Sequence, residues 1–139
     1  MKCIYIDGIF DLFHRGHLES LKQAKNISDD TYLIVGVISD SKAADYKRRP
    51  VINHEDRIEI IKNIKIVDKV IEDPPLVIDL DFVNKYKIDL VVHGFQDDED
   101  WKKQFDFFKS LINENKFRRI SYYHKTSTTQ IINKIKLSY

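Results

Sequence analysis

The chain carries between Asp7 and His17 the segment Asp7-Gly8-Ile9-Phe10-Asp11-Leu12-Phe13-His14-Arg15-Gly16-His17. The apolar run at residues 3–6 precedes it and predicts a β-strand. Apolar residues at three-to-four spacing follow it and predict a helix over residues 17–25. The segment therefore leaves a strand and enters a helix, which is the local arrangement of many ligand-binding loops.

Two histidines in this segment, His14 and His17, are separated by three positions and include Gly16 between them. At a helix N-terminus both imidazoles lie beside free backbone amides, and this combination suits the charge of a phosphate under attack. One alternative is a capping residue and a surface residue, and another is a pair of metal ligands. No cysteine, glutamate or third histidine stands at a neighbouring spacing that would complete a zinc site.

The rest of the chain alternates between predicted strands and helices. Further strands are expected at residues 32–38, 67–71, 90–93 and 120–123, and further helices at residues 56–64, 80–87, 101–113 and 128–136. Five strands separated by helices predict an α/β fold, namely a single domain over residues 1–139 with a five-stranded parallel sheet covered by helices on both faces. The Asp73-Pro74-Pro75 stretch is interpreted as a fixed loop and not as a domain linker.

In such a sheet, ligands bind at the carboxyl ends of the strands, where the strand order changes direction. The loops expected there are residues 7–16, 39–54, 94–100 and 124–128. The last of these leads into Ser127-Thr128-Thr129, which opens the final helix. Hydroxyl side chains at that place predict a helix cap, and a cap with free amides also binds phosphate.

Composition narrows the class of protein. The 139 residues are 42% hydrophobic and 32% charged, with a formal net charge of +1, which is typical of a globular domain and gives no general reason for nucleic-acid binding. The basic clusters Lys47-Arg48-Arg49 and Arg118-Arg119 lack interleaved stacking aromatics. The single cysteine, Cys3, is expected to be a buried thiol, and we expect a cytoplasmic protein without a signal peptide or membrane anchor.

The motifs resemble those of a known family. Gly8-Ile9-Phe10-Asp11 followed by His14-Arg15-Gly16-His17 is similar to the HxGH motif of the nucleotidylyltransferase superfamily, and within it to the cytidylyltransferases acting on phosphocholine, phosphoethanolamine and glycerol 3-phosphate. The resemblance continues through residues 31–37, 50–57, 67–70, 88–94 and 127–129, which is essentially the whole chain. It implies a Rossmann-like domain, transfer of CMP from CTP with Mg²⁺, phospholipid precursor synthesis and a homodimer.

The resemblance also implies roles for particular residues. His14 and His17 would stabilise the pentavalent phosphorus, and Lys47 would lie close to the triphosphate. The residues that it implies for nucleotide binding are Gly8, Ile9, Phe10, Asp11, Arg57, His93, Gly94, Lys125, Ser127, Thr128 and Thr129. The residues themselves leave alternatives open: Lys47 in a solvated basic loop, Arg57 in an exposed helix salt bridge, and Asp11 as either a Mg²⁺ ligand or a residue that orients the first loop.

One position departs from the family pattern. Aligning Ser127-Thr128-Thr129 with the family element places Tyr122 where the family has an arginine. Among the nearby cations Lys125, Arg118 and Arg119, we expect Lys125 to replace it. Because the family arginine is missing at this position, a second hypothesis is a nucleotide-binding domain without catalytic activity.

The sequence contains features of two classes of alcohol substrate. Leu76 stands where the choline enzymes have a tryptophan, whereas the acidic stretch with Asp97, Asp98, Asp100 and Trp101 is expected to bind the substrate. The first half of the chain resembles the choline and ethanolamine enzymes, and the stretch around Trp101 resembles the glycerol 3-phosphate enzymes. We expect an amino-alcohol phosphate, with glycerol 3-phosphate as the alternative. An adenylyltransferase is disfavoured because Leu12 and Ile132 replace residues typical of that group.

Overall fold

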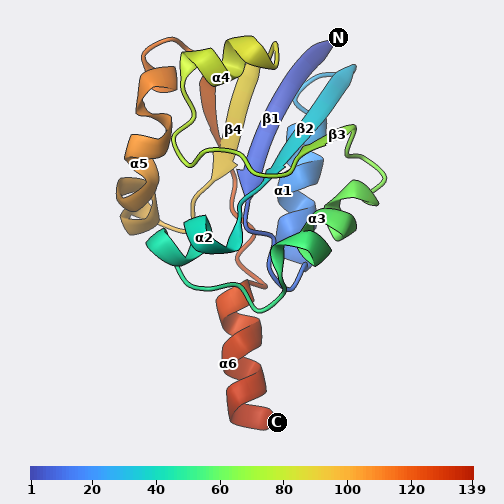
Figure 1. Ribbon diagram of the computed structural model, residues 1–139, viewed down its shortest axis with the longest axis vertical. Helices are drawn as coiled ribbons and strands as arrows, with labels where there is room; N and C mark the ends of the chain where they lie inside the picture. Colours follow the sequence, from blue (N-terminus) through green and yellow to red (C-terminus); the bar gives the residue numbers. More distant parts are fainter.

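The computed structural model describes residues 1–139, and it contains a five-stranded sheet with helices on both faces (Figure 1). The strands are β1 (Lys2–Gly8), β2 (Thr31–Val37), β3 (Lys69–Ile71), β4 (Leu90–Gly94) and β5 (Phe117–Ile120). The helices are α1 (Arg15–Lys25), α2 (Asp40–Tyr46), α3 (His54–Lys62), α4 (Leu80–Lys85), α5 (Asp98–Ile112) and α6 (Thr128–Ser138). All strand pairs are parallel, so the predicted fold class is confirmed.

The strand order is β3-β2-β1-β4-β5. The second and third strands are therefore added on one side of β1, and β4 and β5 on the other side. This change of direction lies between β1 and β4, where Ile4 pairs with Leu90 and Tyr5 with Val91. A crevice opens beyond the carboxyl ends of two strands that diverge in this way. The topology alone therefore places the ligand site beside Gly8 and Gly94.

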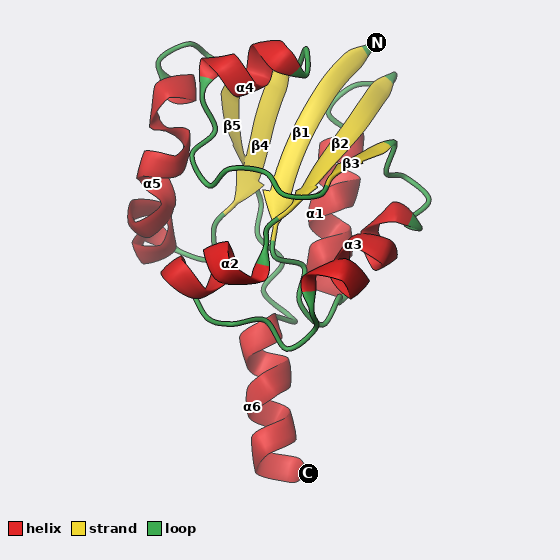
Figure 2. Ribbon diagram, viewed as in Figure 1, coloured by secondary structure: helices red, strands yellow, loops and turns green.

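Alternate residues of the central strands serve two cores. Ile4 and Ile6 of β1 pack on one face, in a cluster with residues of α1 and α3, whereas Tyr5 packs on the other face with residues of α4 and α5. Figure 2 shows these helices on either side of the sheet. Burial on both faces explains why the central strands are continuous apolar runs.

Two predicted strands and one loop differ from the observed structure. The fifth strand was expected at residues 120–123 but spans Phe117–Ile120, because its register with β4 pairs Gly94 with Ile120 and ends the ladder there. The third strand is also shorter than expected. Residues 40–46, expected in a loop, form α2, in which only Ala43 is buried; such a helix lacks the apolar periodicity that reveals a helix in a sequence.

Helix α6 stands apart from the other elements. Its first residue, Thr128, is its only buried one, and the helix projects away from the sheet (Figure 1). At the opposite end of the molecule, Cys3 is half-buried and not buried as expected.

Candidate active site

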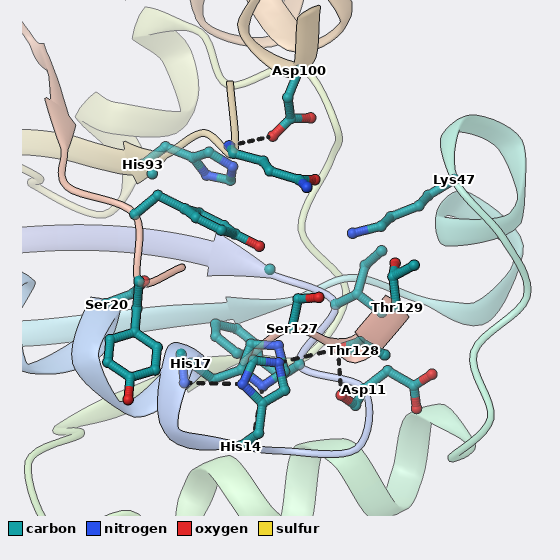
Figure 3. A pocket seen from close by; sticks show the side chains of 18 of the residues that line it. Asp11, His14, His17, Ser20, Lys47, His93, Asp100, Ser127, Thr128 and Thr129 are labelled. Atoms are coloured by element: carbon teal, nitrogen blue, oxygen red, sulfur yellow. Dashed lines mark hydrogen bonds between the residues drawn. The ribbon is translucent and has the colours of Figure 1, made fainter. Parts of the chain in front are cut away.

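A pocket lies at the carboxyl ends of β1 and β4, where the topology predicts it (Figure 3). Side chains from both strands, from the loops and from the first turns of α1 and α6 line it. The residues expected to act on the nucleotide that line the pocket are Gly8, Ile9, Phe10, Asp11, His14, His17, Lys47, His93, Gly94, Ser127, Thr128 and Thr129. Residues separated by more than 100 positions in the sequence thus meet in one place.

The two histidines form the N-terminal cap of α1. The Nδ1 atom of His14 accepts a hydrogen bond of 2.9 Å from the Gly16 amide, and the Nδ1 atom of His17 accepts one of 3.2 Å from the His14 amide. The rings are stacked with 3.8 Å between their centroids. His14 is therefore a helix-capping residue, as the alternative interpretation predicted, and it also lines the pocket.

These bonds fix the protons on both rings. Because each Nδ1 accepts from an amide, a neutral ring carries its proton on Nε2. Thr128 Oγ1 donates to the carbonyl of Asp11 at 3.0 Å, so its contact of 3.3 Å with His14 Nε2 is one in which the imidazole donates. His17 Nε2 has no protein partner and is not buried, which leaves its N–H as a donor toward the pocket.

Both imidazoles are held in the neutral form. Burial lowers the pKa of His17 to about 3, and the positive charge that His14 and Lys47 would add acts in the same direction. Burial also lowers the pKa of His14, with Lys47 as the second cause. At neutral pH the pair therefore offers hydrogen bonds without formal charge.

The loop between β1 and α1 has a constrained backbone. Phe10 and Leu12 have φ angles of 55° and 50°, a region that costs about 1 kcal/mol or more for residues with a side chain. Phe10 is buried, and the two carboxylate oxygens of Asp11 accept from the amides of Val51 and Ile52 at 2.8 and 2.9 Å. Asp11 thus orients the first loop by tying it to a second one.

Arg57 holds three loops together beneath the pocket and does not line it. It is fully buried, and its guanidinium donates to the carbonyls of Ile9, Ile38 and Ile52 and to Asp40 Oδ1 at 2.6 Å. Burial alone would raise the pKa of Asp40, but the hydrogen bond from Arg57 and other contacts lower it. Arg57 is thus not an exposed helix residue, and its guanidinium connects loops behind the pocket lining.

Two neighbouring cations, Lys47 and Arg48, line the other wall. Lys47 follows α2 and points across the pocket from the side opposite His93 (Figure 3). Burial lowers the pKa of Lys47, and the charge of Arg48 lowers it further. Neither side chain has a carboxylate partner within 4.0 Å, since every ion pair of the chain involves other residues.

Acidic groups gather at the opposite end of the pocket. Asp7 is buried and lies 3.6 Å from His93 Nδ1, a buried nitrogen without a hydrogen-bond partner. Asp100 accepts from the Gln96 amide and from the Gln104 side chain. Burial raises the pKa of Tyr46, and the charges of Asp7 and then Asp100 add to this, which shows that both carboxylates act on one region.

Besides Arg57, four expected site residues lie outside the pocket. Lys125 is exposed, Asp97 caps α5 by accepting from the Asp100 amide, and Asp98 lies in the first turn of that helix. The Trp101 ring packs against Phe95 at 4.8 Å between centroids. Of the acidic stretch only Asp100 reaches the pocket.

The structure adds lining residues that the sequence patterns did not indicate: Ser20, Tyr46, Arg48, Gln96, Lys103, Gln104, Tyr123 and Thr126. Tyr122, at the position of the family arginine, lines the pocket as well. Tyr122 and Tyr123 follow the short β5, so they leave the sheet at its carboxyl end. The preference of aromatic residues for strands concealed this position.

The protein has no preformed metal-binding site made of His, Cys, Asp or Glu side chains. No group of three or more His, Cys, Asp or Glu side chains is placed to hold a metal ion, and both oxygens of Asp11 are occupied by amides. Arg118 and Arg119, which were considered as replacements for the family arginine, also lie outside the pocket.

The fold and site define an α/β domain of the Rossmann type, with a pocket at its topological switch point that is lined by two helix N-termini and by cationic side chains. The chain belongs to the cytidylyltransferase-like family, whose model matches residues 5–134. This membership accounts for the pairing of a histidine motif with a hydroxyl-rich helix start.

Curated relatives agree with this assignment. The chain is 36% identical to choline-phosphate cytidylyltransferase A of Mus musculus over 98% of its own length and 37% of the mouse protein, and 36% identical to choline-phosphate cytidylyltransferase 2 of Arabidopsis thaliana over 98% and 45%. It is 32% identical to the ethanolamine-phosphate cytidylyltransferase of Dictyostelium discoideum over 96% and 36%. The chain thus spans less than half the length of these relatives.

A solved structure shares the fold. The lipopolysaccharide core biosynthesis protein from Thermoplasma volcanium GSS1 superposes with a TM-score of 0.69 and 29% identity, over 88% of this chain and 98% of that one.

No helix of the chain combines the length and the apolar character needed to span a bilayer.

Proposed function

We propose that this chain transfers the CMP portion of CTP to phosphocholine or phosphoethanolamine and releases pyrophosphate, a step of phospholipid precursor synthesis. The contact of 3.3 Å between His14 Nε2 and Thr128 Oγ1 carries the proposal, because it joins the histidine motif to the start of α6 in one pocket. The names of the choline-phosphate and ethanolamine-phosphate relatives support this class of substrate.

In the proposed reaction an oxygen of the substrate phosphate attacks the α-phosphorus of CTP in line. A new P–O bond forms, the bond from the α-phosphorus to the bridging oxygen breaks, and its electron pair leaves with pyrophosphate. Such a transfer requires positioning and charge stabilisation and no strong base. The Nε2–H of His17 and the ammonium of Lys47 are the groups we assign to the charge on the reacting phosphate.

The acidic end of the pocket supports an amino alcohol. Asp7 and Asp100 present carboxylates there, and a carboxylate attracts an ammonium group, whereas a glycerol hydroxyl needs only hydrogen bonds. Leu76, in place of an aromatic residue, removes one face for a quaternary ammonium. Glycerol 3-phosphate remains the second candidate on the resemblance around Trp101.

We propose that Mg²⁺ enters as the complex of CTP, because magnesium is commonly bound through substrate phosphates with few protein ligands. This matches the absence of a carboxylate or histidine cluster. On the family resemblance we further propose a cytoplasmic homodimer. Light scattering of the purified chain measures whether it is a dimer.

The test is a panel of phosphocholine, phosphoethanolamine and glycerol 3-phosphate with labelled CTP and Mg²⁺, followed by product identification. We expect a cytidine diphosphate product from an amino-alcohol phosphate. The His17→Ala variant should lose about 10²–10³ in turnover, since it lacks the free donor. Binding of CTP without product from any alcohol would indicate the silent domain, and near-normal turnover of H17A would refute the assigned role.

A further inference from the structure

Arg48 is the only arginine that lines the pocket. Its Nη1 donates a hydrogen bond of 3.2 Å to Thr129 Oγ1, and Thr129 is the second residue of α6. The side chain therefore reaches from the segment after α2 to the N-terminus of a helix that is 81 positions away in the sequence.

None of the other guanidinium groups lines the pocket, and three of them have partners elsewhere. Arg57 is buried with four hydrogen-bond partners, and Arg15 pairs with Glu19 at 2.6 Å. Arg119 lies over the Phe95 and Trp101 rings at 5.4 and 5.5 Å. Arg48, by contrast, has a single hydrogen bond and no carboxylate partner, so most of its donors are available to a ligand.

The surroundings of Arg48 favour an anion of high charge. Its charge lowers the pKa of Lys47, and the charges of Asp100 and Asp11 act in the opposite direction, although no carboxylate lies within 4.0 Å of either cation. The first amides of α6 have no partner within the helix, and the positive end of the helix dipole points to the same place. Two cations that line one pocket with a helix N-terminus are arranged for phosphate groups.

Two adjacent residues at the start of α6 contact different parts of the pocket. Thr128 contacts His14, beside the donor of His17, whereas the next residue, Thr129, contacts Arg48. A triphosphate whose reacting phosphorus lies beside the histidines extends its remaining phosphates toward Thr129 and Lys47.

We propose that Arg48 binds the pyrophosphate portion of the nucleoside triphosphate and neutralises the charge that the departing pyrophosphate acquires when the bridging P–O bond breaks. This inference rests on the proposed function for the identity of the ligand. Arg48 thus supplies the cationic group that was expected from Lys125 in place of the family arginine, whose position Tyr122 occupies.

The test compares Arg48→Ala and Arg48→Lys with Arg49→Ala, whose exposed arginine does not line the pocket. Calorimetry measures the binding of inorganic pyrophosphate, Mg-CTP and CMP to each variant. We expect R48A to weaken pyrophosphate and Mg-CTP about 10- to 100-fold, as for a charged hydrogen bond, with R48K intermediate. CMP affinity should stay unchanged, because CMP lacks these phosphates.

Equal pyrophosphate and CTP affinities in R48A and R49A would overturn the proposal, as would a parallel loss of CMP affinity. Unchanged melting temperatures of the ligand-free variants show that folding is not the cause of a loss. Because the readout is binding, a wild-type chain that binds pyrophosphate through Arg48 but forms no product would refute the proposed function alone.

Discussion

Thr128 has one hydroxyl proton, and the chain directs it to the Asp11 carbonyl while the oxygen accepts from His14. The hydroxyl is therefore engaged within the protein, although the sequence patterns indicated a phosphate ligand. We expect Thr128→Val to lower kcat up to about tenfold with little change in the KM for CTP, and Thr128→Ser to restore it. Steady-state kinetics measures both; a rise in KM with unchanged kcat would show that the hydroxyl binds CTP directly.

His17 also makes stability depend on pH. Its pKa is about 3 in the folded chain and 6.5 ordinarily, so between these values the unfolded chain binds a proton that the folded chain does not. The contribution of His17 to the free energy of unfolding therefore rises as the pH increases from about 3 to 6.5. Above pH 6.5 this contribution is fully present and no longer changes with pH.

We expect the urea midpoint of the wild type to fall more between pH 7 and pH 4 than that of His17→Asn, whose amide oxygen can still accept from the His14 amide. His124→Asn, at an exposed histidine, is the control and should behave as the wild type. An identical decrease in H17N and the wild type would contradict the neutral state of the half-buried His17.

At the scale of elements, the turn from β1 into α1 depends on Gly16 for space. A Cβ there would lie 2.7 Å from His14 Cε1 and 2.9 Å from the Thr126 carbonyl oxygen, and the second contact is to backbone. Gly16→Ala should therefore displace the His14 ring and lower kcat about 100-fold. Asn26→Ala, at the other end of α1, is the control for stability; normal turnover of G16A would show that the turn adapts.

The caps explain which elements were recognisable. Ser127 accepts from the Gln130 amide and Gln130 from the Ser127 amide, a capping box that the sequence reveals directly. Helix α2 has a serine cap as well, but one buried residue gives it no apolar face. Local chemistry was therefore sufficient for α6 and insufficient for α2.

At the scale of the whole molecule, the pocket gathers residues from β1, β4, α1, α5 and α6 and from the segment after α2. A ligand that contacts all of them binds only the folded chain and must stabilise it. We expect Mg-CTP at roughly 100 times its Kd to add about 3 kcal/mol to the free energy of unfolding, seen as a rise in melting temperature. ATP should give a smaller shift; an equal or larger one would favour an adenylyltransferase.

The sequence by itself determined the parallel sheet, the position of the site at its switch point and the histidine motif, because apolar periodicity and helix caps are local properties that neighbouring residues dictate. Only the tertiary structure decided which charged side chains reach the pocket. Arg57 turns inward to three carbonyls, Lys125 stays exposed, and Arg48 crosses to Thr129. A side chain's partner depends on which loops the fold brings within a few ångströms, and no spacing along the chain encodes that distance.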